Sequence, residues 1–180
     1  MLRTILIYGI IGGIIVTVPM DLQVLAFSEQ MPPGWAMFVG YATMIVALTS
    51  VFLGIKQYRD KTLGGVIKFL PALGVGLGIS IIAGVIYVAG WDISLALTKW
   101  DFAKDYAQST VAAAQAQGAS AAELEKTRAE MAEFAKNYAN PLYRWPMTFI
   151  EIFPVGVLIS LISAALLRNS RFMPAREKLA

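Results

Sequence analysis

The amino-acid sequence predicts an all-α, polytopic membrane protein with four transmembrane helices and an extracytoplasmic helical hairpin between the third and the fourth. The chain of 180 residues is 57% hydrophobic and 15% charged, with a mean hydropathy of +0.62. Soluble domains are roughly 45–50% apolar and about 25% charged, so both departures indicate a lipid environment. Four segments are apolar over the roughly twenty residues that a helix needs to cross a bilayer. The whole chain, residues 1–180, is expected to form one transmembrane domain.

The first predicted span covers residues 4–27, "TILIYGIIGGIIVTVPMDLQVLAF", and follows Arg3. A cleaved signal peptide is the alternative, because "VLA" before Phe27 resembles a cleavage site. The apolar stretch is longer than a normal signal-peptide core, and it contains Pro19 and Asp21 near its end. These features favour an uncleaved span.

The other spans are predicted at residues 35–55, 69–91 and 145–167. With four spans, all the tryptophans of the chain gather at one membrane face, as in the aromatic belts of membrane proteins. They are Trp35, Trp91, Trp100 and Trp145.

The distribution of lysine and arginine predicts that both termini are cytoplasmic. Arg3, the C-terminal tail and a basic turn all fall on one side of the four spans. The basic turn consists of Lys56, Arg59, Lys61 and Lys68. The short turn on the other side, "SEQMPPG" at residues 28–34, has no basic residue. Residues 92–144 contain six basic and seven acidic residues and are nearly neutral.

Residues 61–71, "KTLGGVIKFLP", predict a short amphipathic helix on the cytoplasmic leaflet. At 100° per residue, four apolar side chains share one side of such a helix, and Lys61 and Lys68 lie opposite. The apolar residues are Leu63, Val66, Ile67 and Leu70. This segment either binds anionic lipid or a partner, or is a plain interfacial anchor.

The third span contains two faces of small residues. Gly74 and Gly78 share one face, and Gly76, Ser80 and Gly84 share the nearly opposite one. Small residues four apart let helix backbones approach closely. The third span is therefore expected to lie inside the bundle, with neighbours on both sides. The first span has one similar face, which consists of Gly9 and Gly13.

Residues 93–139 form the only sizeable polar segment and predict a helical hairpin outside the membrane. Ser120 and Glu123 have the spacing of a capping box, and Gly118 marks the break between the two helices. The hairpin is either a docking surface for another membrane or extracytoplasmic protein, or a self-packed connection. Both interpretations stay open, since fifty residues are a long connection.

The sequence contains no cysteine and no histidine. Disulfides, thiolate metal ligands, imidazole ligands to a metal or haem, and Ser-His or Cys-His nucleophiles are therefore excluded. We expect no metal, no cofactor and no enzymatic activity, although carboxylate, lysine or tyrosine chemistry stays possible. Nucleic-acid binding is not expected of so apolar a chain.

The stretch "LGIKQYRDKTLGGVIKFLPALGVGLGISIIAGVIY", residues 53–87, resembles the core of the bacterial domain-of-unknown-function 4199 family. The entry "NPLYRW" and the final "LISLISAALLRNS" are similar to that family as well. The resemblance covers nearly the whole chain, and the hairpin is where divergence is most expected. It implies a small four-span protein of the bacterial cytoplasmic (inner) membrane and no established activity, so it transfers no catalytic residue.

Two acidic residues fall inside the predicted spans. Asp21 and Glu151 are expected at one depth, roughly 9 Å below the outer boundary. A charged acid costs about 2.5–3.5 kcal/mol at mid-bilayer and less near the edge. Each can therefore face water, or be protonated and hydrogen-bonded to Gln23, Thr148 or a tyrosine. Arg144 can reach Glu151 only by bending inward. If the first and fourth spans are neighbours, the two carboxyls instead face each other and bind a cation or an amine.

These observations favour a non-enzymatic, partner-binding or scaffold component of the membrane. The alternative is a small transporter or ion-coupled carrier that uses Asp21 and Glu151, in which case a homo-oligomer is expected because four spans make a small pathway. A lipid-modifying enzyme ranks third, since histidine and cysteine are missing.

Overall fold

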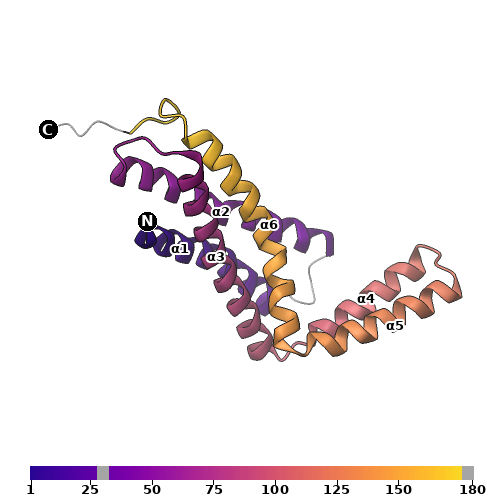
Figure 1. The fold of residues 1–180 in the computed structure, drawn as a ribbon. Helices are drawn as coiled ribbons and strands as arrows, with labels where there is room; N and C mark the ends of the chain where they lie inside the picture. Colours follow the sequence, from indigo (N-terminus) through magenta and orange to yellow (C-terminus); the bar gives the residue numbers. More distant parts are fainter. Residues whose placement is uncertain (28–32, 176–180) are drawn as a thin grey trace.

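The computed structural model describes residues 1–27 and 33–175, and this part of the chain is helical, without strands (Figure 1). Its helices are α1 (Leu2–Phe27), α2 (Pro33–Thr62), α3 (Phe69–Thr98), α4 (Phe102–Ala116), α5 (Ala121–Tyr138) and α6 (Pro141–Leu167). Four of them, α1, α2, α3 and α6, are long and apolar enough to cross a membrane, as predicted. The helices extend beyond the predicted spans: α2 ends at Thr62, α3 ends at Thr98 and α6 begins at Pro141.

Part of the sequence prediction lies outside the described residues. This applies to most of the turn "SEQMPPG" and to the last five residues of the tail, and the side chain of Trp35 is likewise not described.

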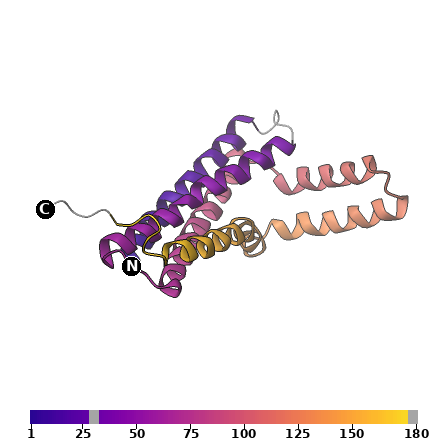
Figure 2. The ribbon, with the colours of Figure 1, turned by 90° about the horizontal axis from the view of Figure 1, so that it is seen from above.

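The four apolar helices form a bundle in which α3 packs along both α1 and α6, as expected for a span with two small-residue faces. The fourth helix, α2, contacts α1, α6 and α3. Helices α4 and α5 pack against each other and project from one end of the bundle, whereas the N-terminus and the end of α6 lie at the other end (Figures 1 and 2).

The interface between α1 and α3 pairs a glycine with a larger residue at each step, at a constant register. Ile5 lies over Gly78, Gly9 lies under Ile82, Gly13 lies under Ile86 and Thr17 lies over Gly90. Each step of four residues along α1 matches a step of four along α3, so the two helices are parallel. A Cβ atom added at Gly90 would overlap the Thr17 Cγ2 atom, which shows how closely the backbones approach.

The interface between α3 and α6 uses the other small face of α3 and runs antiparallel. Gly76 lies against Ser160, and Ser80 lies against Gly156. The hydroxyl oxygens of Ser80 and Ser160 are 3.3 Å apart, and each hydroxyl donates to the carbonyl four residues earlier in its own helix. Both serines are thereby satisfied while the backbones stay close.

One member of the predicted packing set does not pack. A Cβ atom added at Gly74 would have no heavy atom of a described residue within 4 Å, whereas one at Gly78 would meet Ile5. Gly84 lies against the ring of Phe149, as expected for the face toward α6. The prediction is therefore wrong for Gly74, because the register that places Gly78 at Ile5 places Gly74 at Met1, before α1 begins.

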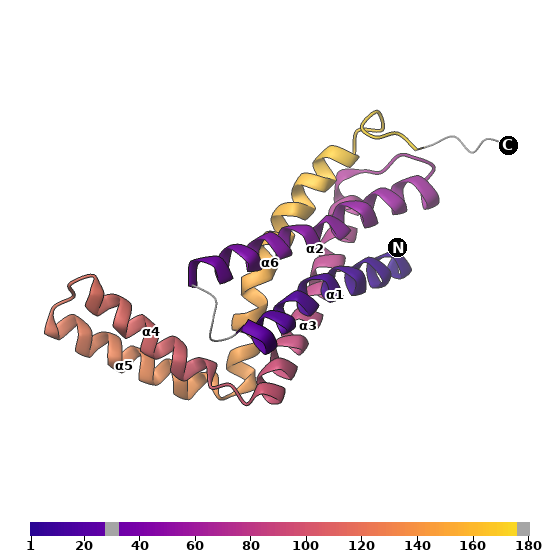
Figure 3. The same ribbon diagram turned by 180° about the vertical axis from the view of Figure 1, so that it is seen from behind.

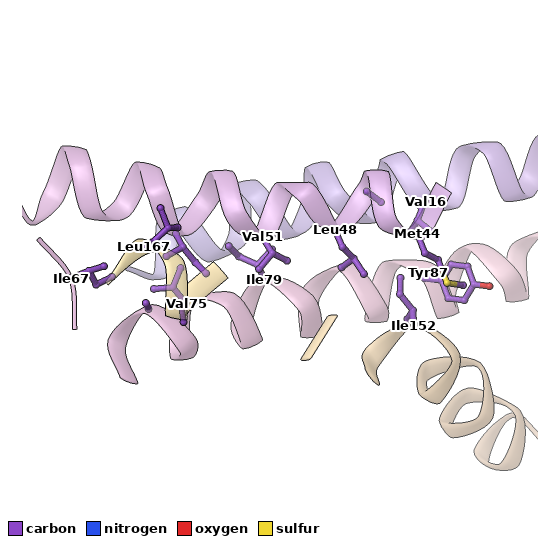
Figure 4. Close-up of a cluster of buried hydrophobic side chains, with 14 residues drawn as sticks. Val16, Met44, Leu48, Val51, Ile67, Val75, Ile79, Tyr87, Ile152 and Leu167 are labelled. Atoms are coloured by element: carbon purple, nitrogen blue, oxygen red, sulfur yellow. The ribbon is translucent and has the colours of Figure 1, made fainter. Parts of the chain in front are cut away.

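The core of the bundle runs along the seam between α2, α3 and α6 (Figure 4). Its most buried side chains are aliphatic, with at most 1% of each exposed: Leu48, Val51, Ile55, Val75, Ile79, Ile152 and Leu167. Large apolar residues on the outer faces of all four helices stay exposed, which suits helices surrounded by lipid.

The amphipathic helix predicted at residues 61–71 is absent. Helix α2 continues through Thr62, and Gly64 and Gly65 then adopt φ angles of 68° and 93°. Two consecutive positive φ values end a right-handed helix, and α3 restarts at Phe69. Of the four apolar residues expected on one face, only Ile67 is buried in the bundle.

Candidate functional site

The two carboxyl groups of the predicted polar site both contact α3. The Ser94 hydroxyl donates to Asp21 Oδ1 at 2.6 Å, so this pair continues the register between α1 and α3 by one further step. The Tyr87 hydroxyl donates to Glu151 Oε2 at 3.3 Å. Tyr87 is 7% exposed, whereas the Glu151 side chain lies on the surface of the bundle.

The structure does not bring Asp21 and Glu151 together. Their partners, Ser94 and Tyr87, are seven residues apart on α3, which separates the two levels by about 10 Å along the helix axis. Among the described residues, α1 and α6 flank α3 and do not pack along each other. The expectation of one depth is therefore wrong, and the candidate pair is two separate carboxyl sites.

The other three members of the predicted site are also dispersed. Thr148 is 3% exposed, and its hydroxyl donates to the Arg144 carbonyl. Gln23 lines a cavity between α1, α2 and α3. Arg144 donates from Nε to Asp92 Oδ1 at 2.8 Å, not to Glu151. Asp92, in the last part of α3, is the ion-pair partner of Arg144 because it lies at the same level as the start of α6.

We expect the two carboxyl sites to be energetically independent. Asp21→Asn and Glu151→Gln should each change the free energy of unfolding. The change in the double variant should equal the sum of the two single changes within about 0.5 kcal/mol. Groups about 10 Å apart with different partners do not couple strongly. Unfolding of all four proteins by denaturing detergent in mixed micelles measures the cycle. A coupling energy well above that value would restore the paired site.

A cluster of aromatic side chains joins the hairpin to the bundle, and we call it the hairpin root. It consists of Trp91, Trp100, Phe102, Tyr106, Phe134 and Tyr138, whose successive ring centroids are 5.1–6.0 Å apart. The Trp91 indole N–H donates to the Tyr138 hydroxyl at 2.7 Å. Burial raises the pKa of the Tyr138 hydroxyl, which stays protonated. The cluster therefore fixes the base of the hairpin by both packing and hydrogen bonding.

An ion pair completes the hairpin root. Arg144 donates to Asp92, and its Nη1 donates to the Tyr138 carbonyl at 3.0 Å. Its guanidinium carbon lies 5.6 Å from the centroid of the Tyr138 ring, and the Trp145 indole N–H donates to Asp92. The end of α3, the end of α5 and the start of α6 are thereby tied at one point (Figure 3).

Three tryptophans of this region belong to the predicted aromatic belt, but the hairpin root is not among the predictions. The available signal is the spacing of aromatic residues four apart on each hairpin helix, at Phe102 and Tyr106 and at Phe134 and Tyr138. Residues four apart share a helix face, so each hairpin helix presents one aromatic face at its base.

The hairpin itself has the predicted local structure. The Ser120 hydroxyl accepts from the Glu123 backbone N–H, and Glu123 Oε2 accepts from the Ser120 backbone N–H at 2.7 Å, which completes the capping box. These hydrogen bonds hold the pKa of Glu123 below its usual value. Gly118 has a φ of 80°, as the break between the helices requires.

A groove of about 760 Å³ runs along the hairpin between α4 and α5. Its floor consists mainly of small and apolar side chains, and charged or amide side chains stand along it. The floor includes Ala107, Val111, Ala112, Met131, Ala132 and Ala135. In α4 and α5 only Ala103 and Tyr138, both near the root, are buried. The groove is therefore open along its length.

The basic turn divides into buried and exposed members. Arg59 is fully buried, and its guanidinium donates to Asp60 at 2.6 Å and to the Phe172 carbonyl at 3.0 Å. Lys56 pairs with Asp60. Only Lys61 and Lys68 are exposed. The basic turn is therefore not one accessible surface, because Arg59 faces the end of α6.

No group of three or more acidic side chains among the described residues is close enough to hold a metal ion. No curated protein and no solved structure matches the chain. The model of one family, described as "Protein of unknown function (DUF4199)", matches residues 6–169. This match includes all four apolar helices and the hairpin, and the chain belongs to the DUF4199 family.

Proposed function

We propose that this protein is a non-enzymatic scaffold that docks a helical segment of a partner protein in the groove of its hairpin. The observation that carries the proposal is the open groove between α4 and α5 on a hairpin whose base is fixed to the bundle. A mere connection between two spans needs neither the aromatic root nor the Asp92–Arg144 ion pair. A rigidly held groove is instead suited to recognition, because little order is lost on binding.

The groove indicates the chemistry of the partner. It extends from Asp101 at the root to Gln115 near the tip, about 20 Å along the helix axis. A helix of about 14 residues has that length. Alanines on both walls let such a helix approach closely. Lys104 and Arg128 favour acidic residues along its edges, whereas Asp101 favours a basic residue at the root.

We place the hairpin outside the cytoplasm of a bacterium and both termini inside. The support is the excess of lysine and arginine at the end of the bundle opposite to the hairpin. Reporters fused after Ala180 and inserted at Thr62 are expected to be active in the cytoplasm, and one inserted at Gly118 outside it. A cytoplasmic signal at Gly118 would refute this orientation.

Two neighbouring alanines test the docking proposal. Ala112 and Ala113 are both exposed on α4, but only Ala112 lines the groove. Ala112→Arg is expected to abolish capture of the partner from native membranes in mild detergent, and Ala113→Arg to retain it, because only the first places a charge in the groove. A photoreactive side chain at Ala132, on the opposite wall, should crosslink to a helical segment of the same partner.

The outcomes separate the alternatives. Equal capture by both arginine variants, or no crosslink from residue 132, would contradict docking in the groove. A crosslink to a second copy of the chain would make the partner the protein itself and indicate a homo-oligomer. A carrier that uses Asp21 and Glu151 is less well supported, because the two carboxyls have separate partners on α3.

A further inference from the structure

A second feature lies inside the bundle, next to the hairpin root. A partly open cavity of about 220 Å³ is lined by residues of α1, α2, α3 and the start of the hairpin. An apolar cavity of about 150 Å³ is large enough to bind benzene. The space therefore suits a molecule of about one ring with a small substituent.

The walls of the cavity favour an aromatic ring. Trp91 and Trp100 both line it, and their indole N–H groups are committed to Tyr138 and Asp105, each at 2.7 Å. The two rings are thus held in place, and they offer apolar surface rather than donors. Met44 lies beside Tyr87 in the cavity wall (Figure 4). Thioether groups make favourable contacts with aromatic rings and adapt to their shape.

The polar lining favours one hydrogen-bonding group and no charge. None of the described side chains that line the cavity is charged. A charged ligand would lose its hydration there without gaining a counter-charge, which is costly. The Gln23 side chain lines the cavity and has no hydrogen bond to any described residue. A primary amide offers both donors and an acceptor to a ligand.

We infer that this cavity is a binding site for a small, uncharged aromatic molecule with a single hydroxyl or similar polar group. The ring lies between Met44 and the indoles of Trp91 and Trp100, and the polar group meets the Gln23 amide. This inference does not depend on the docking proposal, since it rests on different residues and a different ligand.

Gly40 is a position from which an added side chain can fill the cavity. Gly40 lines the cavity, and a Cβ atom added there would have no heavy atom of a described residue within 4 Å. Gly74 has the same open surroundings but lies outside the cavity. Gly40→Leu and Gly74→Leu therefore make the same substitution in open surroundings, but only Gly40→Leu adds it to the lining of the cavity.

The probe is 4-bromobenzyl alcohol, whose bromine quenches tryptophan fluorescence on contact, added to the full chain in detergent. Wild type and Gly74→Leu should show saturable quenching, and Gly40→Leu should bind the probe about tenfold more weakly or worse. Gln23→Leu should weaken the binding of the alcohol but not the binding of 4-bromotoluene, which lacks the hydroxyl. Gly40→Ala should have an intermediate effect, and it serves if the leucine variant does not fold.

Quenching that rises without saturation, or that is equal in Gly40→Leu and wild type, would overturn the proposal, since the probe would then only partition into the micelle. Saturable quenching by a phospholipid with brominated acyl chains, lost in Gly40→Leu, would overturn it too. The site would in that case hold a lipid chain.

Discussion

Arg59→Met is expected to reduce the free energy of unfolding by about 3–5 kcal/mol, the usual cost of removing one partner from a buried ionic network. The Arg59 side chain is fully buried between the end of α2 and the end of α6. It donates to the carbonyl of Leu167, the last residue of α6, and to the carbonyls of Phe172 and Met173 in the segment that follows. Methionine fills the space but leaves these carbonyls and the Asp60 carboxylate without their donor.

The matched control is Lys61→Met, two residues along the same helix. Lys61 is exposed, so this variant should change the stability by no more than about 0.5 kcal/mol. Arg59→Lys should lower the free energy of unfolding more than Lys61→Met does. An ammonium group lacks the planar fork of donors with which the guanidinium reaches several carbonyls. Unfolding in mixed micelles measures all three. Similar losses for Arg59→Met and Lys61→Met would contradict the role of Arg59 as a link between α2 and α6.

Gly76→Leu is expected to lower the stability of the bundle by about 3 kcal/mol, at the upper end of the usual cost of overpacking. A Cβ atom at this position would lie 2.9 Å from both Cβ and Oγ of Ser160 and 3.0 Å from Ile55 Cδ1. The larger part of a leucine side chain has no room between α3 and α6, so the helices must separate. The loss should appear as a lower melting temperature of the protein in detergent.

Gly74→Leu is the control for the same substitution two residues earlier on α3. Its surroundings are open, and leucine is a better helix former than glycine by roughly 0.8 kcal/mol. We therefore expect no loss of stability. Gly84→Leu should cause a loss of stability between those of Gly74→Leu and Gly76→Leu, because the ring of Phe149 that the new side chain meets can rotate away. Equal melting temperatures for the variants at residues 74 and 76 would refute the proposed packing of α3.

The four apolar helices and the hairpin follow from the sequence because their causes are local. The thickness of the bilayer selects the length of an apolar segment whatever its neighbours are, and all four predicted spans lie within helices. The capping box at Ser120 and Glu123 and the break at Gly118 depend on residues within one turn. Small residues four apart also predicted correctly that α3 has helices on both sides.

Only the tertiary structure decided which side chains meet. Periodicity places Gly74 and Gly78 on one face, but the crossing of α1 over α3 reaches only Gly78. The ends of the predicted spans place Asp21 and Glu151 at one depth. In the structure α6 begins four residues before its predicted span, and each acid accepts a hydrogen bond from a different level of α3. Arg59 reads as a surface charge in a basic turn, and it is buried because residues 167–173, more than a hundred positions away, fold over it. Contacts of this kind depend on register between helices distant in sequence, which local hydropathy and spacing do not encode.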